Sequence, residues 1–279
     1  MPNGGPGPGT TLPADGLFGP DSISWRVHAD PSMALGGLRA LLLQALHPLA
    51  MAGVAQHSAF REDPWGRLHR TASFIGAVTY GTGPEAQQAV DRVRRVHVRV
   101  RGTEPVTGLP YRADDPELLL WVHCSEVGSF LGTARRAGLA LTDAEAATYL
   151  REQAAVARLV GVPGTVPVPE TPAELDRYTA RVRPRLLVTP AAREAVRFAF
   201  LPPLHGLALA ATPAWAGLAG LALALLPGWA RRMYGLPGWA LTDRTATLEA
   251  RALRTAALRL PRSWREGPHL VAARERHGV

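Results

Sequence analysis

The sequence predicts an all-α protein built as one large helical domain. Ala, Leu and Arg, all strong helix formers, dominate the 279-residue chain, and apolar residues recur at helical spacing along most of it. No alternating pattern is long enough to predict a substantial strand. With 47% hydrophobic and 19% charged residues, the chain can bury a sizeable core. We expect a disordered Gly/Pro-rich tail over residues 1–14, the domain over 15–258 and a polar, loosely held C-terminal tail over 259–279.

Caps and prolines mark the helices in order. The expected helices cover residues 31–55, 65–79, 84–101, 117–136, 142–160, 171–182, 189–200 and 242–258. Ser32 is the expected N-cap of the first helix, and Pro48 should break or kink it. Thr142 and Glu145 have the spacing of a capping box. Residues 161–172 carry four prolines and two glycines, so they form a connector between helices of one core.

A long uncharged stretch lies between Arg197 and Arg231. It is long enough to cross a bilayer, but four prolines interrupt it and much of it is Ala and Gly. We therefore favour buried helices, and keep membrane insertion or surface association as the alternative, because transmembrane helices tolerate proline. The Ala/Leu-rich residues 207–226 could line an apolar substrate pocket.

The charge of the chain argues against nucleic acid. All 31 basic residues are arginine and the formal net charge is +8, but the arginines are interleaved with Asp and Glu, and no recognised nucleic-acid motif accompanies them. A single cysteine, Cys124, excludes an intramolecular disulfide and multi-cysteine metal sites. The start lacks the pattern of a signal peptide, so we expect a cytoplasmic protein, with a membrane-peripheral one as the alternative.

His97 is the most informative of the nine histidines. On the expected helix 84–101, Ala86, Val90, Val93, Val96 and His97 fall on one apolar stripe with Val100, away from most of the arginines. A neutral imidazole in an apolar wall suits an axial haem ligand. A core histidine bonded to a neighbouring carbonyl would show the same pattern.

A second candidate is the face formed by Arg67, Arg70, Thr71 and Phe74, which share one side of a helix by their spacing. If that face is buried, each arginine must find an anion or an acceptor, such as a haem propionate. If it is solvated, the group is an ordinary surface turn.

A third cluster contains His123 and Glu126, three residues apart on one helical face, as two ligands or an acid–base pair. Cys124 diverges from His123 by about 100° on the helix, so these two cannot form a nucleophile–base dyad. His47, just before Pro48, and His57 have no assigned role.

Several segments, taken in order, resemble one family. They are residues 46–48 (LHP), 52–58 (AGVAQHS), 63–71 (DPWGRLHRT), 96–102 (VHVRVRG), 111–116 (YRADDP) and 120–123 (LWVH). Their order along residues 15–255 resembles the mpaB-type oxygenase family, which also contains the latex-clearing rubber oxygenase.

The resemblance implies an all-α, globin-like core around haem b and the oxidative cleavage of double bonds in apolar molecules with dioxygen. Arg67, Arg70 and Thr71 match an Arg-x-x-Lys-Thr motif, and His97 matches the proximal iron ligand, with His123 as the runner-up. Arg70 replaces the lysine, and arginine keeps its proton, so Arg70 should not bind iron. Arg67 and Arg70 would stabilise negative charge as dioxygen is reduced, and Thr71 could relay a proton. The rival readings are a non-catalytic haem- or apolar-ligand-binding protein, and a membrane-peripheral helical protein without cofactor.

Overall fold

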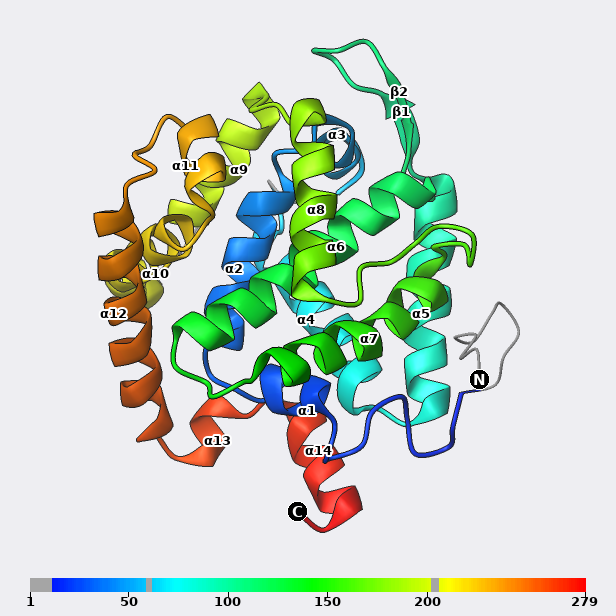
Figure 1. The fold of residues 1–279 in the computed structure, drawn as a ribbon, viewed down its shortest axis with the longest axis vertical. Coiled ribbons are helices and arrows are strands. Elements are labelled where there is room, and N and C mark those ends of the chain that lie inside the picture. The colour runs from blue at the N-terminus through cyan, green and yellow to red at the C-terminus, as the bar shows by residue number, and fades with distance from the viewer. Residues whose placement is uncertain (1–11, 59–61, 202–205) are drawn as a thin grey trace.

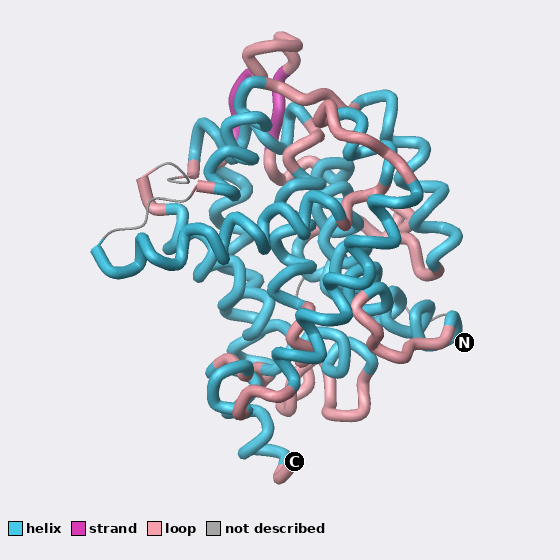
Figure 2. The backbone as a smooth tube through the Cα atoms, turned by 90° about the vertical axis from the view of Figure 1, so that its left-hand side faces the viewer, coloured by secondary structure: helices cyan, strands magenta, loops and turns pink. Residues whose placement is uncertain are grey.

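The computed structural model describes residues 12–58, 62–201 and 206–279. Within these ranges the chain forms fourteen α-helices, two 3-10 helices and one two-stranded hairpin (Figure 1). The elements are α1 (Ile23–His28), α2 (Met33–Gln44), α3 (Pro48–His57), α4 (Pro64–Tyr80), α5 (Gly83–Arg99), β1 (Arg101–Thr103), β2 (Pro110–Arg112), α6 (Pro116–Arg136), α7 (Asp143–Val160), α8 (Pro172–Val182), η1 (Arg183–Arg185), α9 (Pro190–Phe200), η2 (Gly206–Ala211), α10 (Thr212–Ala224), α11 (Gly228–Met233), α12 (Ala240–Leu258), α13 (Arg262–Arg265) and α14 (Pro268–His277). Figure 2 shows that helices make up most of the backbone, with the hairpin at one end. The predicted all-α single domain is confirmed.

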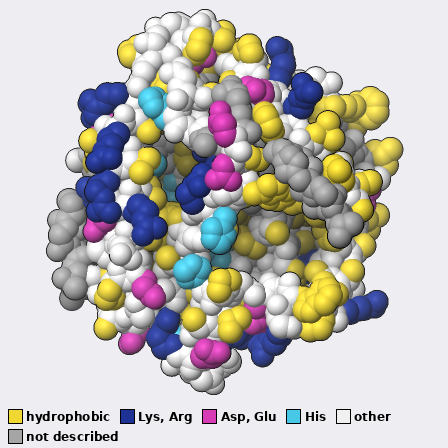
Figure 3. Space-filling model, turned by 180° about the vertical axis from the view of Figure 1, so that it is seen from behind, with side chains coloured by type: hydrophobic (Ala, Val, Ile, Leu, Met, Phe, Trp, Pro, Cys, Tyr) yellow, Lys and Arg dark blue, Asp and Glu magenta, His cyan; other side chains and the backbone are white. Residues whose placement is uncertain are grey.

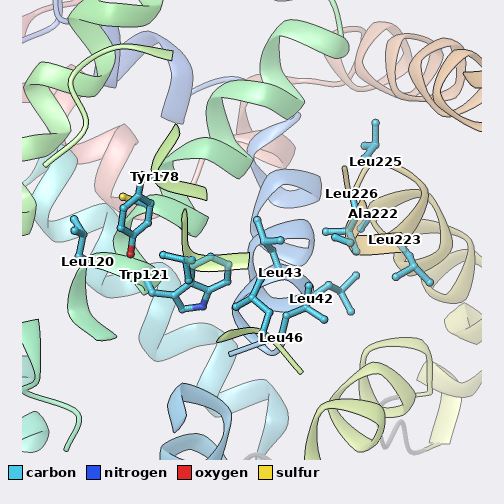
Figure 4. Packing of buried hydrophobic residues seen from close by; sticks show 14 of the residues in the cluster. Leu42, Leu43, Leu46, Leu120, Trp121, Tyr178, Ala222, Leu223, Leu225 and Leu226 are labelled. Atoms are coloured by element: carbon cyan, nitrogen blue, oxygen red, sulfur yellow. The ribbon is translucent and has the colours of Figure 1, made fainter. Parts of the chain in front are cut away.

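The centre of the domain is the long contact between α2 and α6. On one side of this pair lie α1 and α7, and on the other lies α10, which packs against α2. Figure 4 shows leucines of α2 between Trp121 of α6 and a group of leucines around the end of α10. Trp121, Leu46 and Leu226 belong to this cluster and are almost completely buried. The apolar stripes of the sequence therefore meet in one main core.

The first expected helix is two helices. Pro48 ends the run, as predicted, and α2 and α3 meet at an angle of 105°. Ser32 precedes α2 but does not cap it, because its backbone is already helical, whereas an N-cap hydroxyl acts from an extended backbone. Its hydroxyl donates instead to Asp30 Oδ1 at 2.6 Å.

The chain ends are packed more closely than the sequence predicts. In the expected C-terminal tail, α14 packs on α4, with Leu270 and Ala273 buried, and the Arg276 guanidinium donates to the carbonyl of Tyr80 at 2.6 Å. The expectation of a loosely held segment is wrong, because these contacts fix a helix that is too short to be stable by itself. Leu12, placed in the N-terminal tail by the sequence, is also buried. Residues 1–11 of that tail lie outside the described residues.

The uncharged stretch is divided among several elements, of which α10 is the longest that lies wholly within it. Residues 202–205 of this stretch lie outside the described residues. The buried residues of α10, including Ala219 and Ala222, pack into the domain. Among the described helices, no single one is long and apolar enough to cross a membrane; α2 and α3 together would meet the criteria of length and composition, but with the sharp bend between them.

Candidate functional site

The hairpin of α4 and α5 positions the first two groups of predicted site residues. Asp63 caps α4 by accepting the Gly66 N–H at 2.8 Å, and Thr82 with Glu85 forms a capping box at the start of α5. The two helices pack along each other on either side of a short turn. Residues about fifteen positions before and after that turn therefore lie at the same level, which brings Arg67 near the level of His97.

His97 lies near the end of α5 and is half-buried. Its Nδ1 atom is shielded from solvent and has no hydrogen-bond partner among the described residues. Burial lowers the pKa of the imidazole, and Asp114 only partly opposes this shift, so the ring is neutral at pH 7. Val96, predicted on the same inward stripe, is exposed instead, because the far end of α5 lies at the rim of the domain.

The four predicted site residues of α4 differ in burial, although their spacing places them on one face of the helix. Arg67 is half-buried, its guanidinium donates to Ser58 Oγ at 2.7 Å, and burial lowers its pKa. Arg70 is 62% exposed and pairs with Asp63 at 3.1 Å. Thr71 donates its hydroxyl to the carbonyl of Arg67 at 3.1 Å, and Phe74 packs against the cluster that contains Val90. Arg67, Thr71 and Phe74 are thus half-buried, whereas Arg70 belongs to the surface.

His123 and Glu126 form the second part of the site, on α6. Asp115 fixes the start of this helix by accepting the N–H groups of Glu117 and Leu118. Burial, and then the charge of Arg158, lower the pKa of His123 to about 4. Burial raises the pKa of Glu126 to about 7. Both groups are therefore mainly or partly uncharged at neutral pH, unlike exposed ones.

Neither His123 nor Glu126 makes a side-chain hydrogen bond to a described residue, and neither side chain is completely enclosed. His123 and Glu126 are therefore largely removed from water but still reachable, as side chains that line a recess in the surface are. Figure 3 shows the back face of the molecule hollowed near its middle, with histidine side chains beside the hollow. The close contacts of α6 are with α2 and α7, whereas α4 packs mainly on α5 and α14.

A buried polar chain that the sequence did not predict lies close to Glu126. His28 of α1 contacts Thr79 Oγ1 of α4 at 2.8 Å through Nδ1, and Tyr149 Oη of α7 at 3.0 Å through Nε2. Burial lowers the pKa of His28 to about 3. Burial, and then the charge of Glu126, raise the pKa of Tyr149. The chain ties three helices together beside the recess. Its members come from segments far apart in sequence, so no local pattern could reveal it.

His47 was unassigned in the sequence, and it shares one feature with His97. Its Nδ1 atom is also buried without a partner among the described residues, and burial lowers its pKa to about 4. The ring packs against Trp121, with the centroids 6.0 Å apart. His47 is a further candidate ligand. His57, in contrast, contacts Tyr111 Oη at 3.1 Å and the carbonyl of Arg101.

The predicted apolar wall has two parts. Leu221, Leu223 and Leu226 are buried in the main core, where α10 meets α2. The start of α10 approaches α4 instead, since the rings of Trp215 and Trp65 lie 5.0 Å apart. Among the described residues, no three His, Cys, Asp or Glu side chains are grouped so that they could hold a metal ion by themselves.

A comparison with known families adds the class of chemistry. A family model described as "ER-bound oxygenase mpaB/B'/Rubber oxygenase, catalytic domain" matches residues 25–259. No curated protein and no solved structure matches the chain. The matched region runs from α1 to the end of α12, and it contains every predicted site residue. The chain therefore belongs to the mpaB/rubber oxygenase family and carries its oxygenase catalytic domain.

Proposed function

We propose that this chain is a haem b-dependent oxygenase that uses dioxygen to oxidise or cleave an apolar, unsaturated small molecule. The family supports oxygenase chemistry in general. The haem, the substrate class and the roles of individual residues are our proposal.

The observation that carries the proposal is the buried, unpartnered Nδ1 atom of His97. An imidazole nitrogen that is removed from water without a new partner costs the fold about 1–3 kcal/mol. An iron atom would supply the missing bond, and it requires the neutral ring that burial favours here. A single histidine suffices, because the porphyrin supplies the other ligands to haem iron. The residues present thus fit a haem.

When bound, haem would supply the redox chemistry of dioxygen activation. The chain's own residues would bind the haem and orient the substrate. Arg67 presents a half-buried cation at the level of His97, where it could bond a propionate or stabilise negative charge. Arg70 contributes to neither role from its place on the surface. The Thr71 hydroxyl, which donates to the helix, retains lone pairs that can accept a proton or a hydrogen bond.

The recess suits an apolar molecule with few polar contacts. Phe74 on α4 and Val122 on α6 are half-buried apolar side chains on the helices that carry the predicted polar groups. His123 and Glu126 are the polar groups on the α6 side. Apolar walls with a few placed polar groups are typical of small-molecule sites. Glu126, with its pKa of about 7, could hold or accept a proton from a substrate bound there.

The test is the absorption spectrum of the protein expressed with haem supply. We expect a Soret band in the wild type that is lost or shifted in His97→Ala and retained in His69→Ala, a matched control on the exposed side of α4. His123→Ala and His47→Ala distinguish the other candidate ligands. If the band survives in His97→Ala but disappears in one of these variants, the haem proposal stands and that histidine is the axial ligand in place of His97.

Absence of the band after haem reconstitution would refute the haem proposal. A band without oxygen uptake in the presence of a panel of alkenes would favour the rival reading, a haem-binding protein without turnover.

A further inference from the structure

The outer face of α12 exposes two large apolar side chains, Leu241 and Leu248. Of its 19 residues, only Ala246 and Ala250 are buried. These two face α6 and α10. Figure 1 shows α12 along the left edge of the molecule, outside α10. The helix is thus held by a narrow strip of small residues and by the ion pairs of Asp243 with Arg231 and of Arg254 with Asp30.

The outer face is a regular stripe. Leu241, Thr245, Leu248, Ala252, Thr255 and Arg259 recur every three or four residues, and all are exposed. Leu241 is 66% exposed and Leu248 is 65% exposed. A soluble helix normally places its leucines on the packed side, whereas here alanines are packed and leucines are outside. The exposed leucines therefore call for a partner outside the domain.

Two tryptophans stand at the ends of the helix. Trp239 immediately precedes α12 and is 68% exposed; Trp264, in α13, is 79% exposed. Exposed tryptophans are rare on surfaces that meet only water. Their combination of an apolar ring and a polar N–H favours the boundary between a lipid layer and water. The helix between them spans about 28 Å.

The charge of α12 and α13 indicates which kind of partner would cover the exposed leucines. From Trp239 to Glu266 there are six arginines and three acidic residues, and two of the arginines are already paired, Arg254 with Asp30 and Arg262 with Glu266. Asp243 is already bonded to Arg231, while Arg244 and Arg259 lie on or beside the stripe, with no carboxylate partner among the described residues. An identical copy docked on the same face would bring like charges together. A bilayer containing anionic lipid would satisfy both the arginines and the leucines.

We propose that the outer face of α12, bracketed by Trp239 and Trp264, docks on the surface of an anionic lipid bilayer. The helix would lie flat, with Leu241 and Leu248 in the headgroup boundary and the arginines among lipid phosphates. This mode of attachment needs no spanning helix. It is independent of the haem, so it can fail while the oxygenase proposal stands.

The test uses the full-length protein and vesicle co-sedimentation. We expect binding to phosphatidylcholine vesicles that contain about one-third phosphatidylglycerol, weaker binding to pure phosphatidylcholine, and a decrease with added salt. Leu248→Glu should lower the partition constant at least about tenfold, because it places a carboxylate at the centre of the face. Arg244→Ala combined with Arg259→Ala should weaken binding only to the anionic vesicles.

Two controls separate this surface from general stickiness. Leu109→Glu changes a leucine on the hairpin loop that is 54% exposed, and Arg92→Ala with Arg95→Ala removes exposed charge from α5. Both should leave binding within about twofold of the wild type, and circular dichroism should show unchanged helix content for every variant. The proposal is overturned if the wild type does not bind vesicles, or if Leu248→Glu binds as well as Leu109→Glu. Sedimentation that shows a dimer abolished by Leu248→Glu would overturn it in favour of a second copy.

Discussion

Glu126→Gln should change how the stability of the protein depends on pH. In the folded chain, burial holds the pKa of this carboxyl at about 7, against an ordinary value of 4.5. Below pH 4.5 the group is protonated in both states, so it adds no pH dependence. Between these values the unfolded chain loses its proton while the folded chain keeps it. The folded state binds more protons there, so stability falls as pH rises, and the cost is complete above about pH 7.

The size of the effect follows from that difference in pKa. A change from 4.5 to about 7 corresponds to at most about 3.5 kcal/mol, since one pKa unit is worth about 1.4 kcal/mol. The side chain keeps some accessible surface, so water will reduce the effect, and we expect about 1–3 kcal/mol. Gln has nearly the same shape and does not ionise. Above pH 7, Glu126→Gln should therefore be more stable than the wild type by that amount, and below pH 4.5 the two should be similar.

Urea unfolding at several pH values between 4.5 and 8.5, followed by circular dichroism, measures this difference. Glu249→Gln, at an exposed position of α12, is the matched control and should leave the pH dependence unchanged. Parallel wild-type and Glu126→Gln curves across this range would refute the reasoning, because they would mean that Glu126 ionises as easily in the fold as in water.

Three further sets of substitutions test the site and its supports. Arg67→Met should weaken azide binding to the haem-loaded protein about tenfold, because it removes a half-buried cation, and Arg70→Met should leave azide binding unchanged. The affinity is measured by titration at the Soret band. Equal losses of affinity in the two variants would contradict the placement of these two arginines. Gly76→Ala should destabilise by about 1–3 kcal/mol, because the added Cβ would lie 2.6 Å from Cδ2 of His269; wild-type protease resistance of the C-terminal helix would contradict this clash. Asp115→Ala should cost about 1 kcal/mol in urea unfolding by removing the cap of α6, and an unchanged midpoint would argue against that cap.

The sequence was informative wherever the cause of structure is local. The spacing of apolar residues placed α4 through α9 within a few residues of their true bounds. Proline and capping residues set most of those ends, as at Pro48 and in the Thr142–Glu145 capping box. The short hairpin and the helices α1, α13 and α14 were missed, because elements of three to ten residues carry too few periods to recognise.

For the candidate site, too, the sequence predicted local features and missed those that depend on distant contacts. Helical spacing placed His123 and Glu126 on one face of α6, where both are half-buried, and the order of the motifs indicated the family that the chain belongs to. Spacing alone also put Arg70 beside Arg67 and Val96 beside His97. In the fold Arg70 and Val96 are exposed while Arg67 and His97 are half-buried, because a helical face says nothing about where the domain ends.

Local chemistry in the sequence thus determined the helices, their caps and the oxygenase family. Only the tertiary structure decided which nitrogen of which histidine is buried without a partner, and that His28, Thr79 and Tyr149 form one chain beside Glu126. It also decided that the leucines of α12 face outward while its alanines are packed. The physical reason is that burial and pairing depend on contacts between helices distant in sequence, and these are fixed when the whole core assembles.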